Sequence, residues 1–305
     1  MLSRVREIFQ QTHVSSQTQL QFDIPEGKYE SLLFNFSGTA DTGKTFDPTD
    51  VGELDIKDAF PLSRVQFSVL DDIAQLKGGI FNRTSNAGGA FDWWIKYPFA
   101  YFTDSDGIFR VASGELVKAT LFYGSNLSTA LGANQLTVKV YGVEKTGVQA
   151  YRLKIEKNDL QVISGRRQYP LAAENIANVF IENNTNLSRI IYRQDGEVAF
   201  DVVPAALENV THDDNRIESF SSTFPLIELN FNRRDRMKKL KNDSNIIELE
   251  STASDTITVT TVSLDFTPDE AAATLAEDSV DSQNRTDRKA RENKTRAVNI
   301  NQLQV

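Results

Sequence analysis

The sequence predicts an all-β protein made of two consecutive β-rich halves. Short apolar runs alternate along the chain with clusters of Gly, Asn, Asp, Ser and Thr, which is typical of many short strands joined by turns. In the run Leu136–Val143, small and apolar side chains alternate with Thr137, Lys139 and Tyr141. Such alternation suits antiparallel sheets with one buried face. The few helical candidates cannot supply the crossovers that a parallel sheet needs.

The elements follow from the same patterns in chain order. The expected strands are Gln19–Ile24, Ser31–Phe36, Arg64–Leu70, Phe91–Ile95, Leu116–Tyr123, Leu136–Val143, Asn178–Glu182, Arg189–Arg193, Phe224–Phe231, Ile246–Glu250 and Thr256–Phe266. The expected helices are Leu2–Gln11, a short piece near Asp72–Lys77, Val203–Val210, Arg233–Lys241 and Pro268–Glu277. Thr267, Pro268 and Glu270 supply the capping signals of the last helix.

A weak internal repeat indicates that the two halves are related. The stretch Ser63–Phe67 leads into an acidic pair and a short helix, and Ser188–Tyr192 leads into an Asp-Gly turn and a helix, at an offset of 125 residues. Near the end of each half, Leu136–Val138 resembles Ile257–Val259 at an offset of 121. A chance likeness between two stretches rich in Val and Thr is the alternative.

We expect four segments from these boundaries. Residues 1–14 form an amphipathic N-terminal segment, 15–146 the first half and 147–266 the second. Residues 267–305 hold a capped short helix and an extended or disordered tail, because 278–305 contains no aromatic and few apolar residues with which to build a core.

Composition excludes several classes of function. The 305 residues include two His and no Cys, which rules out disulfide frameworks, thiol nucleophiles and the usual zinc sites. The net charge of −9 argues against specific nucleic-acid binding. No run of 18 apolar residues and no signal peptide is found, so we expect folding in a cytoplasm. A Ser-His-Asp site is nearly excluded, since only His13 and His212 could be its base and no G-x-S-x-G motif occurs.

The sharpest motif is a phosphate-loop pattern that we interpret as non-functional. Gly38, Gly43, Lys44 and Thr45 match G-x-x-x-x-G-K-[ST] after a plausible strand. A phosphate loop needs a helix that begins at its Lys-Thr pair, whose amides bind the phosphates. Here Pro48 follows closely and disfavours that helix. A polar loop between strands is the preferred interpretation, with nucleotide binding as an alternative.

A metal site is only weakly indicated. Asp104 and Asp106, with the glycine that follows them, resemble the start of a calcium loop, but the rest of that motif is missing. A β-turn explains the same residues, so we expect no cofactor, with structural calcium at Asp104 and Asp106 as the alternative.

Two segments are candidates for contact with a neighbouring chain or a membrane surface. Leu2, Val5, Ile8 and Phe9 would share one side of the N-terminal helix. A basic run between positions 233 and 241 carries six positive charges, on Arg233, Arg234, Arg236, Lys238, Lys239 and Lys241. Packing on its own domain and a solvated basic face are the respective alternatives.

An aromatic segment, Phe91–Phe102, has seven aromatic side chains in twelve positions. Alternation places Trp93 opposite Trp94, so both faces of the strand are partly apolar. The segment is therefore strand core, or core together with a protein–protein interface.

The sequence resembles a known family at several of these places. Phe22–Glu30 runs into Phe34–Gly38 as a strand, a Pro/Gly turn and a strand ending in Ser-Gly, and Ser188–Val198 is a strand that meets an Asp-Gly turn. Together with the strand-then-proline pattern of Phe91–Pro98, these stretches are similar to the double jelly-roll major capsid proteins of tailless icosahedral bacteriophages with an internal membrane, of the corticovirus and finnlakevirus types. The resemblance covers residues 15–266 in the order of elements. The insertion Thr39–Phe60 and the tail have no counterpart.

The resemblance implies two tandem antiparallel jelly-roll barrels with a few short helices. It implies homotrimers that form pseudo-hexagonal capsomers and an icosahedral shell over an internal membrane, with no enzymatic activity. The implied partners are further copies of the chain, minor capsid, vertex or membrane proteins, and possible contact with a lipid surface. The location is the virion, assembled in the host cytoplasm. A phage spike or carbohydrate-binding jelly roll is the main alternative, although such a module would carry aromatics on exposed loops.

Overall fold

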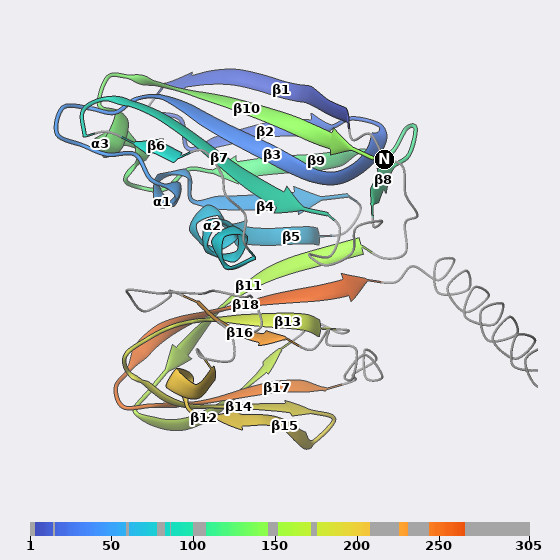
Figure 1. Ribbon diagram of the computed structural model, residues 1–305, viewed down its shortest axis with the longest axis vertical. Coiled ribbons are helices and arrows are strands. Elements are labelled where there is room, and N and C mark those ends of the chain that lie inside the picture. The colour runs from blue at the N-terminus through green and yellow to red at the C-terminus, as the bar shows by residue number, and fades with distance from the viewer. Residues whose placement is uncertain are drawn as a thin grey trace, which may run out of the picture. The chain divides into compact units, whose positions relative to one another are not determined.

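The computed structural model describes residues 4–265 except 15, 59–60, 78–82, 86, 100–107, 146–151, 172–175, 208–225 and 231–243 (Figure 1). The helices are α1 (Pro48–Val51), α2 (Phe67–Leu76) and α3 (Leu127–Leu131). The strands are β1 (Arg4–Val14), β2 (Gln19–Ile24), β3 (Gly27–Thr39), β4 (Glu53–Lys57), β5 (Pro61–Gln66), β6 (Arg83–Ser85), β7 (Ala90–Pro98), β8 (Phe109–Val111), β9 (Val117–Phe122), β10 (Gln135–Glu144), β11 (Arg152–Val162), β12 (Gly165–Leu171), β13 (Ile176–Glu182), β14 (Leu187–Gln194), β15 (Glu197–Val202), β16 (Leu226–Asn230), β17 (Asn245–Ser251) and β18 (Asp255–Asp265). None of the described helices is long and apolar enough to cross a bilayer.

Three sheets contain these strands. Sheet I has the order β1-β10-β3-β7-β6, with β8 also paired to β3. Sheet II has eight strands in the order β16-β13-β18-β11-β5-β4-β9-β2, and sheet III has the order β12-β17-β14-β15. In Figure 1, β4, β5, β11 and β18 of sheet II follow one another through the middle of the view, below β1 and β10 of sheet I and above β17, β14 and β15 of sheet III. Sheet II is therefore shared by the two halves of the chain.

The two halves repeat one topology. The eight main strands of each roll can be numbered one to eight by their order along the chain. In the first roll, without the short strands β6 and β8, these are β1, β2, β3, β4, β5, β7, β9 and β10. In the second roll they are β11 to β18. Places 1-8-3-6 form one sheet and places 2-7-4-5 the other in both halves. This is the two-sheet arrangement of a jelly roll. The expected all-β fold of two tandem jelly rolls is confirmed.

Each roll encloses its own core. In the first roll, the rings of Phe34 and Phe36 on β3 stack at 6.3 Å, and Phe22 on β2 meets Phe34 at 6.4 Å. In the second roll, Val179 and Ile181 on β13 belong to a buried cluster to which β11 to β14 and β16 to β18 contribute side chains. Hydrophobic burial in these two interiors is the main force that stabilises the fold.

The N-terminal helix expected over Leu2–Gln11 is wrong. Residues Arg4–Val14 form β1, which pairs antiparallel with β10 along its whole length. The register shifts between Glu7 and Phe9, so a β-bulge lies at this point. A bulge inserts one extra residue, so side chains before and after it that face the same side are no longer two positions apart. The apolar residues of β1 therefore have a spacing that resembles that of a helix.

The strand expected over Arg64–Leu70 is correct only in its first part. β5 ends at Gln66, and Phe67–Leu76 form α2. Val69 and Leu70 are adjacent and both buried, which a strand with one buried face would not allow. The helix expected near Asp72–Lys77 is thus present but begins earlier.

One anchor of the internal repeat is confirmed and the other is wrong. Leu136–Val138 lies in β10 and Ile257–Val259 in β18, which hold the same eighth place in their rolls. Ser63–Gln66 lies in β5, at the fifth place, whereas Ser188–Tyr192 lies in β14, at the fourth.

Of the other expected helices, one is described in part. Residues Pro204–Leu207 are helical, and the remainder of Val203–Val210 lies outside the described residues. The helices expected at Arg233–Lys241 and Pro268–Glu277, and the tail, also lie outside them.

Candidate functional site

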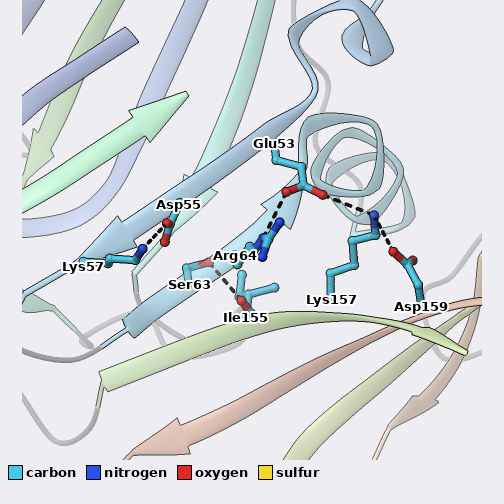
Figure 2. A network of polar contacts seen from close by, with 8 residues as sticks. All are labelled: Glu53, Asp55, Lys57, Ser63, Arg64, Ile155, Lys157 and Asp159. Atoms are coloured by element: carbon cyan, nitrogen blue, oxygen red, sulfur yellow. Dashed lines mark hydrogen bonds and ion pairs between the residues drawn. The ribbon is translucent and has the colours of Figure 1, made fainter. Parts of the chain in front are cut away.

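The most informative region is the seam where the first roll meets the second. β5 of the first roll pairs in parallel with β11 of the second, with Ser63 opposite Ile155 and Arg64 opposite Glu156. The Ser63 hydroxyl donates a hydrogen bond to the backbone oxygen of Ile155 at 3.1 Å, and both residues are buried. Figure 2 shows this contact. The seam makes one continuous sheet from strands of both rolls.

Charged side chains connect the two sides of the seam at one end. The Glu53 carboxylate on β4 accepts from Arg64 Nε at 3.1 Å and from Lys157 Nζ at 3.2 Å. Lys157 lies on β11 and also contacts Asp159 at 2.9 Å (Figure 2). The Lys157 side chain is 12% exposed while that of Arg64 is 69% exposed, so the contact between the rolls is the better shielded of the two.

A second, more deeply buried contact joins the rolls. Lys77, at the end of α2, places Nζ 2.6 Å from the Glu228 carboxylate on β16. Asn178 on β13 donates to the same oxygen, and Lys77 Nζ lies 5.8 Å from the centre of the Phe180 ring. Glu228 is 2% exposed. A carboxylate buried so deeply is stable only with its cation and hydrogen bonds in place.

Helix α2 carries this contact from the first roll. Its first residue, Phe67, is buried and meets the rings of Phe34 and Phe36 at 5.3 Å each. The Phe67 amide donates to the backbone oxygen of Gly52 at 2.9 Å. One end of α2 is thus fixed in the first core, and Lys77 at the other end binds the second roll.

The outward face of sheet I carries an aromatic pair. Trp94 on β7 stacks on Tyr141 of β10 with ring centres 5.5 Å apart, and its indole nitrogen donates to Asp92 at 3.3 Å. Partial burial, and next the negative charge of Glu7, raise the pKa of Tyr141. Both tryptophans of the aromatic segment lie within a strand rather than on a loop.

The residues of the phosphate-loop pattern span the end of a strand and an irregular loop. Gly38 lies in β3, and residues 44–47 are irregular. The next helix, α1, begins only at Pro48, has four residues and is capped by the Asp47 side chain. No helix therefore presents its amides to a phosphate at Lys44 and Thr45.

This geometry predicts that Lys44→Ala changes neither the stability of the protein nor its behaviour toward ATP. Lys44 is exposed, so its removal should change the free energy of unfolding by less than about 0.5 kcal/mol. In a phosphate-release assay, ATP should be hydrolysed no faster with the wild type or the variant than in buffer without protein. ATP turnover that is lost in Lys44→Ala would contradict the loop interpretation.

The other candidate site residues divide into two groups. Asp104 and Asp106, and the basic run Arg233–Lys241, lie outside the described residues. Within the part of the chain that is described, no three acidic, His or Cys side chains come together as metal ligands.

The N-terminal contact residues lie on β1 rather than on a helix face. Val5 is 57% exposed, whereas Phe9 stacks on Phe22 of β2 at 4.8 Å. Ile8 lies at the bulge, and Leu2 is outside the described residues. The single apolar face expected for this segment is therefore divided between solvent and the first core.

His13 is a buried titratable group on β1. It is 1% exposed, its Nδ1 is hydrogen-bonded to the Gln17 side chain, and its ring meets that of Tyr123 at 5.5 Å. Burial lowers the pKa of His13 below its usual 6.5, and the hydrogen bond to Gln17 offsets part of that shift.

The lowered pKa predicts acid-sensitive stability. Below about pH 6.5 the unfolded chain takes up a proton at His13 that the folded chain does not, so the free energy of unfolding should fall as the pH decreases. His13→Gln should flatten this dependence. Urea unfolding from about pH 7.5 to 5.5 measures it, and equal slopes in wild type and variant would rule His13 out as the cause.

Sequence reasoning missed the seam. Ser63 was noted only as the start of a repeat anchor, Lys157 belongs to no motif, and Lys77 is one lysine among many. A signal does exist in β11, where the apolar positions change from Leu153 and Ile155 to Leu160 and Val162, from odd to even. Such a change indicates a strand whose two ends bury opposite faces.

The comparisons with known proteins concern the fold. No protein-family model and no curated protein matches the sequence. Solved structures do match. A chain in the atomic structure of Sulfolobus Turreted Icosahedral Virus gives a TM-score of 0.66 at 12% identity, covering 90% of this chain and 96% of that one. The major capsid protein P2 from Bacteriophage PM2 gives 0.60 at 11% identity, covering 87% and 98%. The Faustovirus major capsid protein gives 0.52 at 5% identity, covering 87% and 91%. This chain therefore shares, over most of its length, the double jelly-roll fold of viral major capsid proteins.

Proposed function

We propose that this protein is a major capsid protein that forms homotrimers and an icosahedral shell over an internal membrane. The observation that carries the proposal is the presence of two rolls of the same strand order in one chain, joined by a continuous sheet. Three such chains supply six similar units, which suits the six-neighbour positions of a closed shell. The fold's likeness to capsid proteins supports the same role.

The role is mechanical and needs no catalytic residues. The buried contacts at Ser63 and at Lys77 hold the two rolls as one unit, which a repeating shell requires of its building block. The proposed partners are further copies of the chain, with minor capsid, vertex and membrane proteins at special positions. The proposed location is the virion, after assembly in the host cytoplasm.

Size-exclusion chromatography with light scattering tests the trimer. We expect a mass of three chains of 34.2 kDa each, and negative-stain images of particles with a six-sided outline. A strictly monomeric species at micromolar concentration would contradict the proposal.

The membrane part has a separate test. The basic run Arg233–Lys241 is its candidate contact, because juxtaposed cations attract anionic lipid headgroups. We expect the protein to float with vesicles that contain anionic lipid and not with neutral ones, and a variant with Arg233, Arg234 and Arg236 changed to Gln to lose that binding. Equal flotation of the wild type and this variant would show that the basic run is not the membrane contact.

A further inference from the structure

We propose that β15 of one copy pairs in parallel with β1 of the next copy, so that the seam inside the chain is repeated between chains. This inference rests on the proposed trimer and names the strands that make its contact. It starts from the internal seam, in which β5 and β11 pair in parallel.

The places of these strands in their rolls carry the first step. β5 is the fifth strand of the first roll, and β11 is the first strand of the second. The remaining fifth and first strands are β15 and β1. Each is the end strand of its sheet among the described residues, with a neighbour on one side only: β14 beside β15, and β10 beside β1. Among the described residues, a fifth strand and a first strand thus each lack a neighbour on one side.

Exposed apolar side chains mark the same two strands. Val5 on β1 is 57% exposed, Val198 on β15 is 49% exposed, and Val203, directly after β15, is 53% exposed. The described residues include only three other large exposed apolar side chains, which are Leu116, Phe122 and Ile163. Open strand edges with apolar side chains favour pairing with another chain.

The ion pair beside the open edge of β15 is the reverse of the ion pair at the internal seam. At the seam, Arg64 on the fifth strand binds Glu53, two residues before its pairing partner on the fourth strand. In the second roll, Asp201 on β15 binds Arg189, which is also two residues before the pairing partner of Asp201, with both oxygens at 2.8 Å. The carboxylate is on the fourth strand in the first roll, and the guanidinium is there in the second.

The first strands of the two rolls, β11 and β1, also differ at the position that would face this ion pair. Lys157 of β11, which binds Glu53, pairs with Thr260. At the 121-residue offset the equivalent of Thr260 is Lys139, whose partner on β1 is Gln10. Arg189 and Asp201 already neutralise each other, so a lysine at this position would add an unpaired charge, whereas the Gln10 side chain can accept a hydrogen bond from Arg189 and donate one to Asp201 of the neighbouring chain. Gln10 therefore fits a neighbour that presents Arg189.

The contact joins different strands of the two copies, so it is heterologous and closes when the rotation between copies forms a ring. Three chains then give six rolls linked alternately by the internal and the external seam.

Disulfide trapping tests the pairing, because the chain has no cysteine of its own. The position equivalent to Arg64 is Asp201, and the position beside the equivalent of Glu156 is Gln10, and both are exposed. We expect Gln10→Cys with Asp201→Cys to give covalent dimers and trimers on a non-reducing gel after mild oxidation. The matched control is Gln21→Cys with Asp201→Cys, since Gln21 is exposed on β2, the end strand of sheet II, and this control should stay monomeric on the gel.

The charge argument has its own readout. Gln10→Lys should shift the trimer toward monomer in light scattering at low salt, and Gln21→Lys should not. Trimers in solution without specific crosslinks, or with equal crosslinks in the control, would overturn this pairing and leave the proposed capsid function standing. Monomers throughout, for wild type as well, would overturn both.

Discussion

Lys77→Met should destabilise the protein strongly, because it removes the cation from a buried ion pair. The variant leaves the Glu228 carboxylate, which is 2% exposed, without its charged partner. Breaking one partner of a buried ion pair costs about 3–5 kcal/mol, so we expect a loss of about 3 kcal/mol in the free energy of unfolding. Urea denaturation followed by far-UV circular dichroism measures it.

Lys57→Met is the matched control. Lys57 pairs with Asp55, whose side chain is 10% exposed, but Lys57 itself is 56% exposed against 18% for Lys77, so solvent screens this pair and the loss of stability should be clearly smaller than for Lys77→Met. The double variant Lys77→Met with Glu228→Gln removes both charges and keeps an acceptor for Asn178, so it should recover most of the lost stability. Equal effects of Lys77→Met and Lys57→Met would show that the Lys77–Glu228 contact does not stabilise the joined rolls.

Phe67→Ala is the second change with a large expected effect. The ring is fully buried and meets Phe34 and Phe36 edge to face at 5.3 Å. Removing a buried phenylalanine side chain costs about 3–5 kcal/mol, because contacts are lost and a cavity is left. Thermal unfolding should show a clearly lower Tm. The loss also loosens α2 and, through it, the contact at Lys77.

Phe122→Ala separates this effect from the general loss of an aromatic ring. Phe122 is 38% exposed, so its removal takes less surface out of the interior and should cost clearly less. A Tm for Phe67→Ala equal to that of Phe122→Ala would mean that α2 is not held by the first core as described.

The strand β10, which has one buried face, could be predicted from the sequence, whereas the end strands β12 and β1 could not. β10 has buried Leu136, Val138 and Val140 at every second position, a period that the sequence shows directly. β12 has exposed residues at Gly165–Gln168 because it is an end strand of sheet III, so its sequence shows no alternation. In β1, the bulge between Glu7 and Phe9 breaks the period of two and suggests a helix instead.

The candidate site could be predicted only in part, because some of its features depend on neighbouring residues and others on residues far apart in the sequence. The interpretation of Gly38–Thr45 as a loop needed only Pro48, whose effect on the backbone is local. The seam needed pairings across 92 residues for Ser63 with Ile155 and 151 residues for Lys77 with Glu228. No local pattern encodes which strands of two similar rolls become neighbours.

Periodicity and composition, which depend on local residues alone, were enough to predict an all-β fold in two related halves, and the sequence contains no cysteine. The folded structure was needed to show that the rolls share one sheet, that α2 links the first core to β16 of the second roll, and that β1 and β15 are end strands among the described residues. Those features depend on which segments, far apart in the sequence, bury their apolar surfaces against each other, and this is a property of the whole folded chain.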